Sequence, residues 1–197
     1  RALAGDFDAD PGRRALQQEH AAHVHLQEEI DRRAVEGTLA DPSDPSFIKW
    51  LHEAFYEGAT EEVLTLRHGG QVVRIVPGEW RQGDVEVGAH VPPPFDTVPS
   101  FMAHYHTRFR LDWLHGQVTR TLAVATAHHR FNFIHPFYDG NGRVSRLMSH
   151  AMVHHAGIGA GGLWSVSRGL ARGLQDGLPG RDEYREMMQL ADRVRQG

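Results

Sequence analysis

The sequence predicts an all-α fold, a helical bundle that carries one short β-hairpin. Apolar residues recur at intervals of three and four along most of the chain, as they do in amphipathic helices. Strand-like alternation beside turn signals stands out in one stretch, residues 77–94. The chain has 197 residues, of which 40% are hydrophobic, so it can form one compact unit with a sizeable core. Within that unit we expect residues 1–60 to be a helical N-terminal extension packed on a domain of residues 61–197.

Two helices are expected near the N-terminus. A charged stretch rich in His and Gln predicts a helix over about 11–36, with a start signal at Asp10 and a stop signal at Gly37. A shorter helix over 46–56 follows an Asp-Pro turn. Its inward residues are expected to be Phe47, Ile48, Leu51, Ala54 and Phe55.

Residues 77–94 predict the hairpin. They contain a Gly-Asp turn signal, the alternating run Val85, Glu86 and Val87, and a proline stop. An exposed strand edge of this kind can pair with an extended peptide through main-chain hydrogen bonds. An ordinary surface hairpin is the alternative interpretation.

The second half of the chain predicts further helices. One is marked by Val98, Phe101, Met102 and Tyr105, and the next by Val118, Leu122 and Ala125. A third has the apolar stripe Val144, Leu147, Met148, Ala151, Met152 and His155. A glycine-rich loop over 157–162 then leads to two helical stretches, near 164–174 and 181–195.

The most informative stretch is residues 135–146, which read HPFYDGNGRVSR. Gly140 and Gly142 lack a Cβ, so they can adopt positive φ and let backbone N–H groups converge on an anion. The apolar stripe begins directly afterwards, so this turn opens a helix N-terminus, which favours a bound phosphate. In isolation the four residues 139–142 would be more typical of a plain tight turn.

Charged side chains surround this turn. Arg143 and Arg146 lie three residues apart on one helix face, so their guanidinium groups can bind two phosphate groups. Asp139 precedes the turn, where a carboxylate can hold a Mg²⁺ ion that bridges phosphates. His135, with an ordinary pKa of about 6.5, is suited to remove a proton from an incoming hydroxyl.

At these residues the sequence resembles the Fic domain family (filamentation induced by cAMP), whose motif His-Pro-Phe-x-(Asp/Glu)-Gly-Asn-Gly-Arg-x-x-Arg is matched at every fixed position. The resemblance implies transfer of AMP from ATP to a Tyr, Thr or Ser hydroxyl of a target protein. It implies that His135 is the general base, that Phe137 is a buried anchor and that Asp139 binds Mg²⁺. Catalytic roles are also implied for Asn141 and Arg143. The implied phosphate-binding residues are Gly140, Asn141, Gly142, Arg143 and Arg146.

The resemblance spans residues 77–172. Residues 77–94 look like the family's flap, a β-hairpin at the rim of the active site, which implies that a target protein docks on Arg81, Val85, Glu86 and Val87. Position alone makes residues 164–168 a candidate adenine pocket. Other Fic proteins transfer phosphate or phosphocholine, or remove AMP, and these reactions are the alternatives within the family. The intact Gly-Asn-Gly-Arg-x-x-Arg favours ATP held by its β- and γ-phosphates.

Many Fic proteins carry an inhibitory helix with the pattern (Ser/Thr)-x-x-x-Glu-(Gly/Asn). Glu36 and Gly37 match the end of this pattern, whereas Arg32 stands where Ser or Thr is expected. Glu36 is therefore a candidate inhibitory residue, and a plain helix C-terminus capped by Gly37 is the alternative. Inhibition by a segment outside this sequence or by an antitoxin-like partner is a further possibility.

Composition excludes several classes of protein. The absence of cysteine excludes disulfides, zinc-thiolate sites and cysteine nucleophiles. A net charge of −4 argues against a nucleic-acid-binding surface, and no apolar run approaches the ~20 residues that span a bilayer. Because the sequence begins at Arg1 and not at Met, we expect a fragment of a longer protein. We expect it in the cytoplasm, or delivered into a host cytosol if the full-length protein is a secreted effector.

The 15 histidines leave a second reaction class open. Three pairs could contribute metal ligands, namely His150 with His154, His23 with His25, and His104 with His106. No pair comes with an obvious acidic third ligand, so we expect most of these side chains to be surface or packing residues. A metal-dependent hydrolase is the alternative enzyme, and a binding module that retains a silent motif is the alternative without catalysis.

Overall fold

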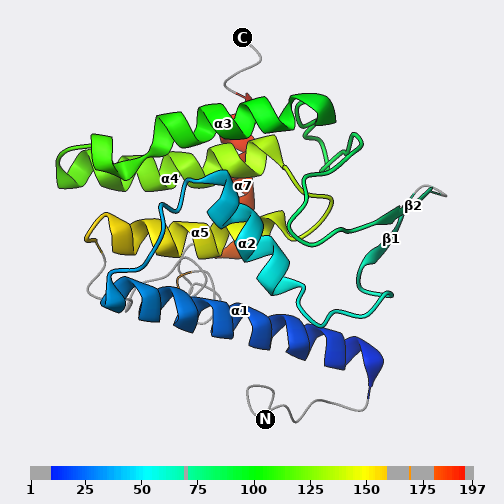
Figure 1. Ribbon diagram of the computed structural model, residues 1–197. Helices are drawn as coiled ribbons and strands as arrows, with labels where there is room; N and C mark the ends of the chain where they lie inside the picture. The colour runs from blue at the N-terminus through cyan, green and yellow to red at the C-terminus, as the bar shows by residue number, and fades with distance from the viewer. Residues whose placement is uncertain (1–9, 69–70, 159–168, 170–179, 194–197) are drawn as a thin grey trace.

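The computed structural model describes residues 10–68, 71–158, 169 and 180–193, and there the chain is a helical bundle with one two-stranded sheet (Figure 1). The helices are α1 (Pro11–Glu36), α2 (Pro45–Phe55), α3 (Val98–Phe109), α4 (Gln117–Ile134), α5 (Asn141–His155) and α7 (Arg181–Arg193), with short 3₁₀ turns at Phe95–Thr97 and Leu111–Trp113. α5 packs between α4 and α1, and α3 covers the outer side of α4. The predicted all-α class is confirmed.

The first two helices begin at acidic caps. The Asp10 side chain accepts a hydrogen bond from Arg13 N (2.9 Å), and the Asp44 side chain accepts one from Ser46 N (2.7 Å). A proline follows each cap, at a position where its missing N–H costs nothing. α1 has the predicted bounds and ends at Gly37, whose φ is 69°. α2 begins and ends one residue before the predicted range.

α5 supplies the middle of the core. Its predicted apolar stripe is confirmed for Val144, Leu147, Met148, Ala151 and Met152, which are at most 1% exposed, while His155 is partly exposed. Leu26 of α1 and Phe47 of α2 belong to the same apolar cluster. Residues on both sides of position 60 therefore share one core, and the division there stays a prediction.

The residues that marked α4 in the sequence lie on its exposed side. Val118 and Leu122 are 73% and 62% exposed, and Ala125 is exposed as well. The buried residues are Val124, Ala127, His128, Phe131 and Ile134. α4 faces the core with a mixture of small, polar and aromatic side chains, so the largest apolar residues of its first turns were a poor guide to its inner face.

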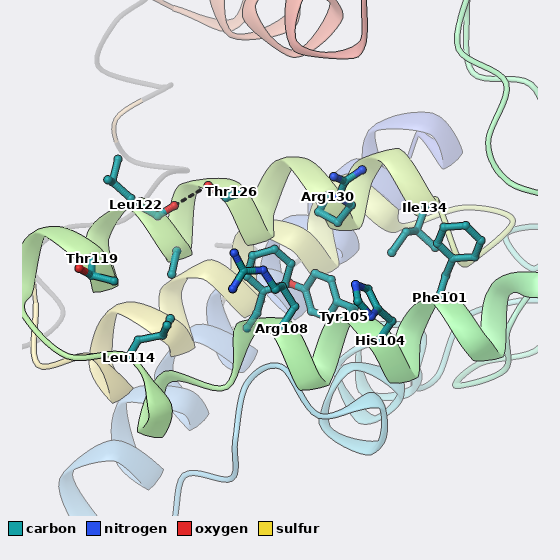
Figure 2. Close-up of a pocket in the computed structure, with 12 residues that line it drawn as sticks. Phe101, His104, Tyr105, Arg108, Leu114, Thr119, Leu122, Thr126, Arg130 and Ile134 are labelled. Carbon is teal, nitrogen blue, oxygen red and sulfur yellow. Dashed lines mark hydrogen bonds between the residues drawn. The ribbon is translucent and has the colours of Figure 1, made fainter. Parts of the chain in front are cut away.

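A cavity of about 650 Å³ lies between α3 and α4 (Figure 2). Phe101 and Tyr105 line it from α3, and Leu122 and Ile134 line it from α4. None of the residues that line it belongs to the stretch 135–146. The cavity therefore reaches the end of α4 at Ile134 but does not include the motif residues.

The β-hairpin is not where the sequence predicted it. The antiparallel strands are β1 (Thr65–His68) and β2 (Gln71–Arg74), with Thr65 opposite Arg74. Residues 77–94, all of them described, form no strand and contain one isolated bridge, between Val87 and His90. Two of these residues bond the motif instead: Arg81 bonds the backbone of His135 and Pro136, and Gln82 N bonds the Tyr138 hydroxyl.

α7 packs against α4, where His128 Nε2 bonds the Tyr184 hydroxyl (2.6 Å) and His129 Nε2 bonds Asp192 (3.0 Å). The predicted helix over 181–195 is thus present up to Arg193. The predicted helix near 164–174, the candidate adenine pocket and most of the loop over 157–162 lie outside the described residues. In the described part of the chain, no helix has the length and apolar content needed to cross a membrane.

Candidate active site

The motif begins where α4 ends, at His135. This residue has φ of 49°, the only positive value outside glycine among the described residues, and its N–H closes the helix on Phe131 O (3.0 Å). Burial lowers the pKa of His135 to about 4, because a hydrogen bond with the Asn132 backbone and the charge of Asp139 only partly oppose it. His135 is therefore a neutral imidazole at pH 7 and can accept a proton.

Asn141 fixes the shape of the loop that follows. Its Oδ1 accepts a hydrogen bond from Phe137 N (3.0 Å), and its Nδ2 donates one to Phe137 O (2.8 Å). Phe137 is fully buried, as expected for an anchor, and stacks on the His52 ring at 3.8 Å between centroids. Both polar atoms of the Asn141 side chain are used inside the loop. The side chain therefore positions the loop, and the predicted catalytic and phosphate-binding roles of Asn141 stay predictions.

The N-terminus of α5 is open. Gly140 has φ of 79°, and a Cβ there would lie 3.2 Å from the Tyr56 ring, so only glycine fits. Gly142 lies inside α5 and does not have the positive φ that we predicted. No side chain caps the helix at Gly140, and no described residue accepts a hydrogen bond from the N–H of Asn141 or Gly142. These two N–H groups and the helix dipole can bind an anion.

Asp139 is held as a carboxylate beside this open end. Burial disfavours its charge, but the Tyr56 hydroxyl (2.8 Å to Oδ2), Arg143 (3.3 Å) and the Gly140 N–H outweigh burial, and the pKa of Asp139 lies below its ordinary value. The side chain is still 45% exposed. An ionised, accessible carboxylate next to an open helix N-terminus fits the ligand preference of Mg²⁺.

The two arginines have different surroundings. Arg143 Nη2 pairs with Glu19 of α1 (2.8 Å), and its Nη1 lies 3.3 Å from Asp139. Arg146 forms no ion pair with any carboxylate in the described part of the chain, although it lies near Gly142 and Tyr184. Burial lowers the pKa of Arg146, a cost that a bound anion would relieve. Of the two motif arginines, Arg146 is thus the one without a carboxylate partner in the described ranges.

Comparison with known proteins identifies the family. The model of the Fic/DOC family matches residues 42–153, more than half of the chain. This chain belongs to the Fic/DOC family. The match includes the whole motif and also α2, which lies in the part that we had predicted to be an extension.

Fic structures and sequences agree with this assignment. A Fic family protein from Desulfovibrio desulfuricans has a TM-score of 0.52 at 22% identity, covering 78% of this chain and 41% of its own. A Fic domain protein from Bacteroides thetaiotaomicron has 0.51 at 23% identity, covering 72% and 49%. The curated protein adenylyltransferases Fic of Drosophila willistoni and Drosophila melanogaster are 41% and 40% identical over 92 residues, 45% of this chain. This Fic chain covers 18% of the length of each of these two relatives.

The flap segment of this Fic chain is fixed to the motif by Arg81. The Arg81 side chain is buried, its Nε donates to His135 O (2.9 Å), and its backbone N–H donates to Pro136 O (2.9 Å). Its guanidinium group bonds backbone oxygens and is buried, so the structure gives no support to the predicted contact between Arg81 and a target, which stays a prediction. Val85 is partly exposed, and Glu86 and Val87 are exposed.

Glu36 lies far from the motif. It is the last residue of α1 and pairs with Arg32 of the same helix (2.5 Å). Glu19, which does reach the motif, is 17 residues earlier, about 25 Å along the helix. In this structure Glu36 is part of an ordinary helix C-terminus, and its inhibitory role stays a prediction without a contact to support it.

Sequence reasoning missed the residues of α1 and α2 that support the motif. His52 accepts a hydrogen bond from Gly78 N (2.9 Å) through Nδ1, so its Nε2 carries the proton and donates to Asp139 O (3.3 Å). Burial lowers the pKa of His52 to about 4, which keeps this tautomer neutral. Tyr56 lies one turn later, at the C-cap of α2. The signal was this polar pair at i, i+4, in line with the apolar positions of an amphipathic helix.

Proposed function

We propose that this chain transfers AMP from ATP to the hydroxyl of a Tyr, Thr or Ser side chain in a target protein. One observation carries the proposal: the neutral His135 precedes a loop that leads to an open helix N-terminus, beside which Arg146 has no carboxylate partner among the described residues. This arrangement supplies a base and an anion site close together. The names of the Drosophila relatives support the same reaction.

The proposed reaction is an in-line displacement at the α-phosphorus. His135 takes the proton of the target hydroxyl, the oxygen attacks phosphorus, and pyrophosphate leaves. The N–H groups of Asn141 and Gly142 hold phosphate oxygens, and Arg146 binds the γ-phosphate. Arg143 binds the β-phosphate after exchanging its contact with Glu19 for the nucleotide.

Asp139 is the residue that would hold Mg²⁺. Its carboxylate is ionised and accessible, and Mg²⁺ usually takes one or two protein carboxylates together with phosphate oxygens and water. Bound there, the ion would neutralise charge on the leaving pyrophosphate. Tyr56 contributes by fixing one carboxylate oxygen through its hydroxyl.

The target protein is proposed to dock along the flap segment. Val85, Glu86 and Val87 are at least partly exposed, and Arg81 fixes the start of this segment to the backbone of His135 and Pro136. An extended peptide bound at these positions would bring its hydroxyl toward the base.

The test is a labelling experiment with Mg²⁺ and ATP that carries the label on either the α- or the γ-phosphate, with a host lysate as acceptor. We expect label in protein from the α-phosphate alone. His135→Ala should lower the rate by ~10²–10⁴-fold while ATP still binds. His135→Asn removes the base as well but tolerates the left-handed backbone at this position, so it separates loss of the base from backbone strain.

The other outcomes oppose the proposal. Label from the γ-phosphate would indicate phosphate transfer. Equal labelling by wild type and both His135 variants would remove the base from the mechanism. No labelling, in a protein shown by calorimetry to bind ATP, would indicate a different transferred group.

A further inference from the structure

Helices α1 and α5 run parallel and meet along a polar seam. Near the start of the seam Glu19 of α1 pairs with Arg143 of α5. Twelve residues further along α1, Asp31 meets His150 and His154 of α5. The two helices lie side by side (Figure 1), so each advance along α1 is matched by an advance along α5. The far end of this seam has a chemistry that the motif does not use.

Asp31, His150 and His154 converge on one point. The Asp31 Oδ1 atom lies 2.6 Å from His150 Nε2 and 2.7 Å from His154 Nε2. The two imidazole rings are nearly perpendicular, with centroids 4.9 Å apart. One atom from each residue lies within 4.8 Å of the other two, and no other group of three such residues is found in the described ranges. The acidic third ligand that the sequence did not reveal is thus supplied by α1.

We propose that Asp31, His150 and His154 form a binding site for a divalent transition-metal ion, with Zn²⁺ as the preferred ion. Two imidazole nitrogens and one carboxylate oxygen are a ligand set that Zn²⁺ takes in proteins. The i, i+4 spacing of the histidines puts both on one face of α5, and the parallel packing of α1 brings the carboxylate to that face.

The present distances allow an ion to enter with little rearrangement. Bond lengths of ~2.0–2.2 Å in a tetrahedral zinc site put neighbouring ligand atoms ~3.3–3.5 Å apart. The two hydrogen bonds to Oδ1 therefore need to open by less than about 1 Å, which rotation of the Asp31 carboxylate can provide. Imidazole bound in this way must present an unprotonated Nε2, so binding displaces the Nε2 protons that now face Asp31.

Burial gives the site one closed and one open side. The side chains of His150 and His154 are 2% and 12% exposed, whereas that of Asp31 is 38% exposed. The closed side restrains the imidazoles, and the open side lets an ion enter and a water take the fourth position. His154 also lies in the last turn of α5, where the helix dipole favours positive charge.

This site is separate from the proposed Mg²⁺ position. His150 follows Asn141 by nine residues, which corresponds to about 13 Å along α5. Mg²⁺ prefers oxygen ligands and keeps its waters, so it should not compete for two imidazoles. The bound ion would fasten α1 to α5 and so stabilise the helix that carries Glu19. The inference does not depend on the reaction that the motif catalyses.

Titration calorimetry on the chelator-stripped protein tests the site, with Zn²⁺ and Mg²⁺ as the two probes. We expect one Zn²⁺ per chain, a higher Tm with Zn²⁺, and no such change with Mg²⁺. Asp31→Asn and His154→Asn, which change two of the three ligands, should each weaken Zn²⁺ binding by at least ~10–100-fold. Visible absorption of bound Co²⁺ gives an independent readout that should be lost in the same variants.

His155→Asn is the matched control. His155 is next to His154 but bonds Asp112 (3.0 Å), outside the cluster, so this variant should bind Zn²⁺ as the wild type does. Circular dichroism without metal shows whether each variant is folded. The proposal is overturned if folded wild-type protein binds no Zn²⁺ stoichiometrically, or if its binding is unchanged by Asp31→Asn and His154→Asn. In either case Asp31 would only join the two histidines by hydrogen bonds.

Discussion

The motif loop has a closed face and an open face. On the closed face Asn141 bonds both backbone groups of Phe137, and Arg81 bonds the carbonyl of His135. On the open face the N–H groups of Asn141 and Gly142 have no acceptor among the described residues, and Arg146 has no carboxylate there. The contrast teaches that the groups which shape the loop already have their partners, whereas the two N–H groups and Arg146, which are proposed to bind phosphate, have no such acceptor in the described part of the chain.

The largest expected effect is a loss of stability in acid, caused by the buried histidines His52, which packs against the closed face, and His128 of α4. Burial lowers the pKa of His52 and of His128 to about 4, against 6.5 for the unfolded chain. Between these pH values the unfolded chain binds more protons, so the free energy of unfolding falls as the pH decreases from about 6.5 to 4. Each such histidine contributes up to roughly 1.4 kcal/mol per pH unit in that window. Thermal unfolding followed from pH 7 to pH 5 should show the decrease.

Two variants sharpen this prediction. His52→Gln should reduce the slope of Tm against pH. The variant lacks the imidazole that takes up a proton in the unfolded chain but not in the folded protein. His25→Gln, which changes an exposed side chain on α1, is the matched control. A Tm that stays constant between pH 7 and pH 5 would show that the buried histidines are not held neutral.

Asn141→Ala should cost ~2–5 kcal/mol of unfolding free energy. The variant leaves the buried N–H and C=O of Phe137 without partners, and each such group costs ~1–3 kcal/mol. Urea unfolding measures the change. Asn132→Ala is the control, since its side chain bonds a helical carbonyl, that of His128, and its loss should cost about 1 kcal/mol or less. Equal losses in the two variants would contradict a special role for Asn141.

Arg146→Gln should weaken ATP binding by ~10–100-fold with little change in Tm, because the lost contacts are charge-assisted bonds to phosphate. Arg143→Gln should weaken binding as well but also lower the Tm, since Glu19 and Asp139 lose their partner. Calorimetric titration with ATP and Mg²⁺ separates the two variants. A large drop in Tm for Arg146→Gln would show that Arg146 belongs to the closed face.

Glu19→Gln should have the smallest effect. It removes a partly exposed ion pair worth about 1 kcal/mol or less, and it frees Arg143 for the nucleotide. ATP affinity should rise by ~2–5-fold with the fold intact. Glu36→Gln, which affects only the pair with Arg32, should leave the affinity unchanged. If ATP affinity decreases in Glu19→Gln, Glu19 positions Arg143 and does not compete for it.

Much of the fold could be predicted from local patterns. Helix caps depend on neighbours in sequence, so Asp10 and Gly37 located the ends of α1. The stripe of α5 was correct because its apolar residues are regular. α4 was harder, since its inner face includes His128 and Ala127, which hydropathy does not distinguish from surface residues. Strand pairing was missed because the register of a hairpin depends on which partner the chain finds.

The motif itself followed from the sequence because its members are neighbours on one loop and one helix turn. Its supporting residues did not, because Glu19, His52 and Tyr56 come from helices about 80 to 120 residues away. Nothing in the local sequence says which side of α1 meets α5. For the same reason the sequence did not show that Asp31 lies beside His150 and His154.

The sequence by itself determined the Fic motif and the helical class, because these depend on residue type and short spacing. It also predicted which groups accept a proton, bind phosphate and hold Mg²⁺. Only the tertiary structure decided that Arg81 and Asn141 support the loop from inside. It also decided that Arg143 is paired, while Arg146 has no carboxylate partner among the described residues. Finally, it decided that Glu19 and Asp31 of α1 bond side chains of α5. Packing sets these roles because a polar side chain binds whatever group the neighbouring helix brings within about 3 Å.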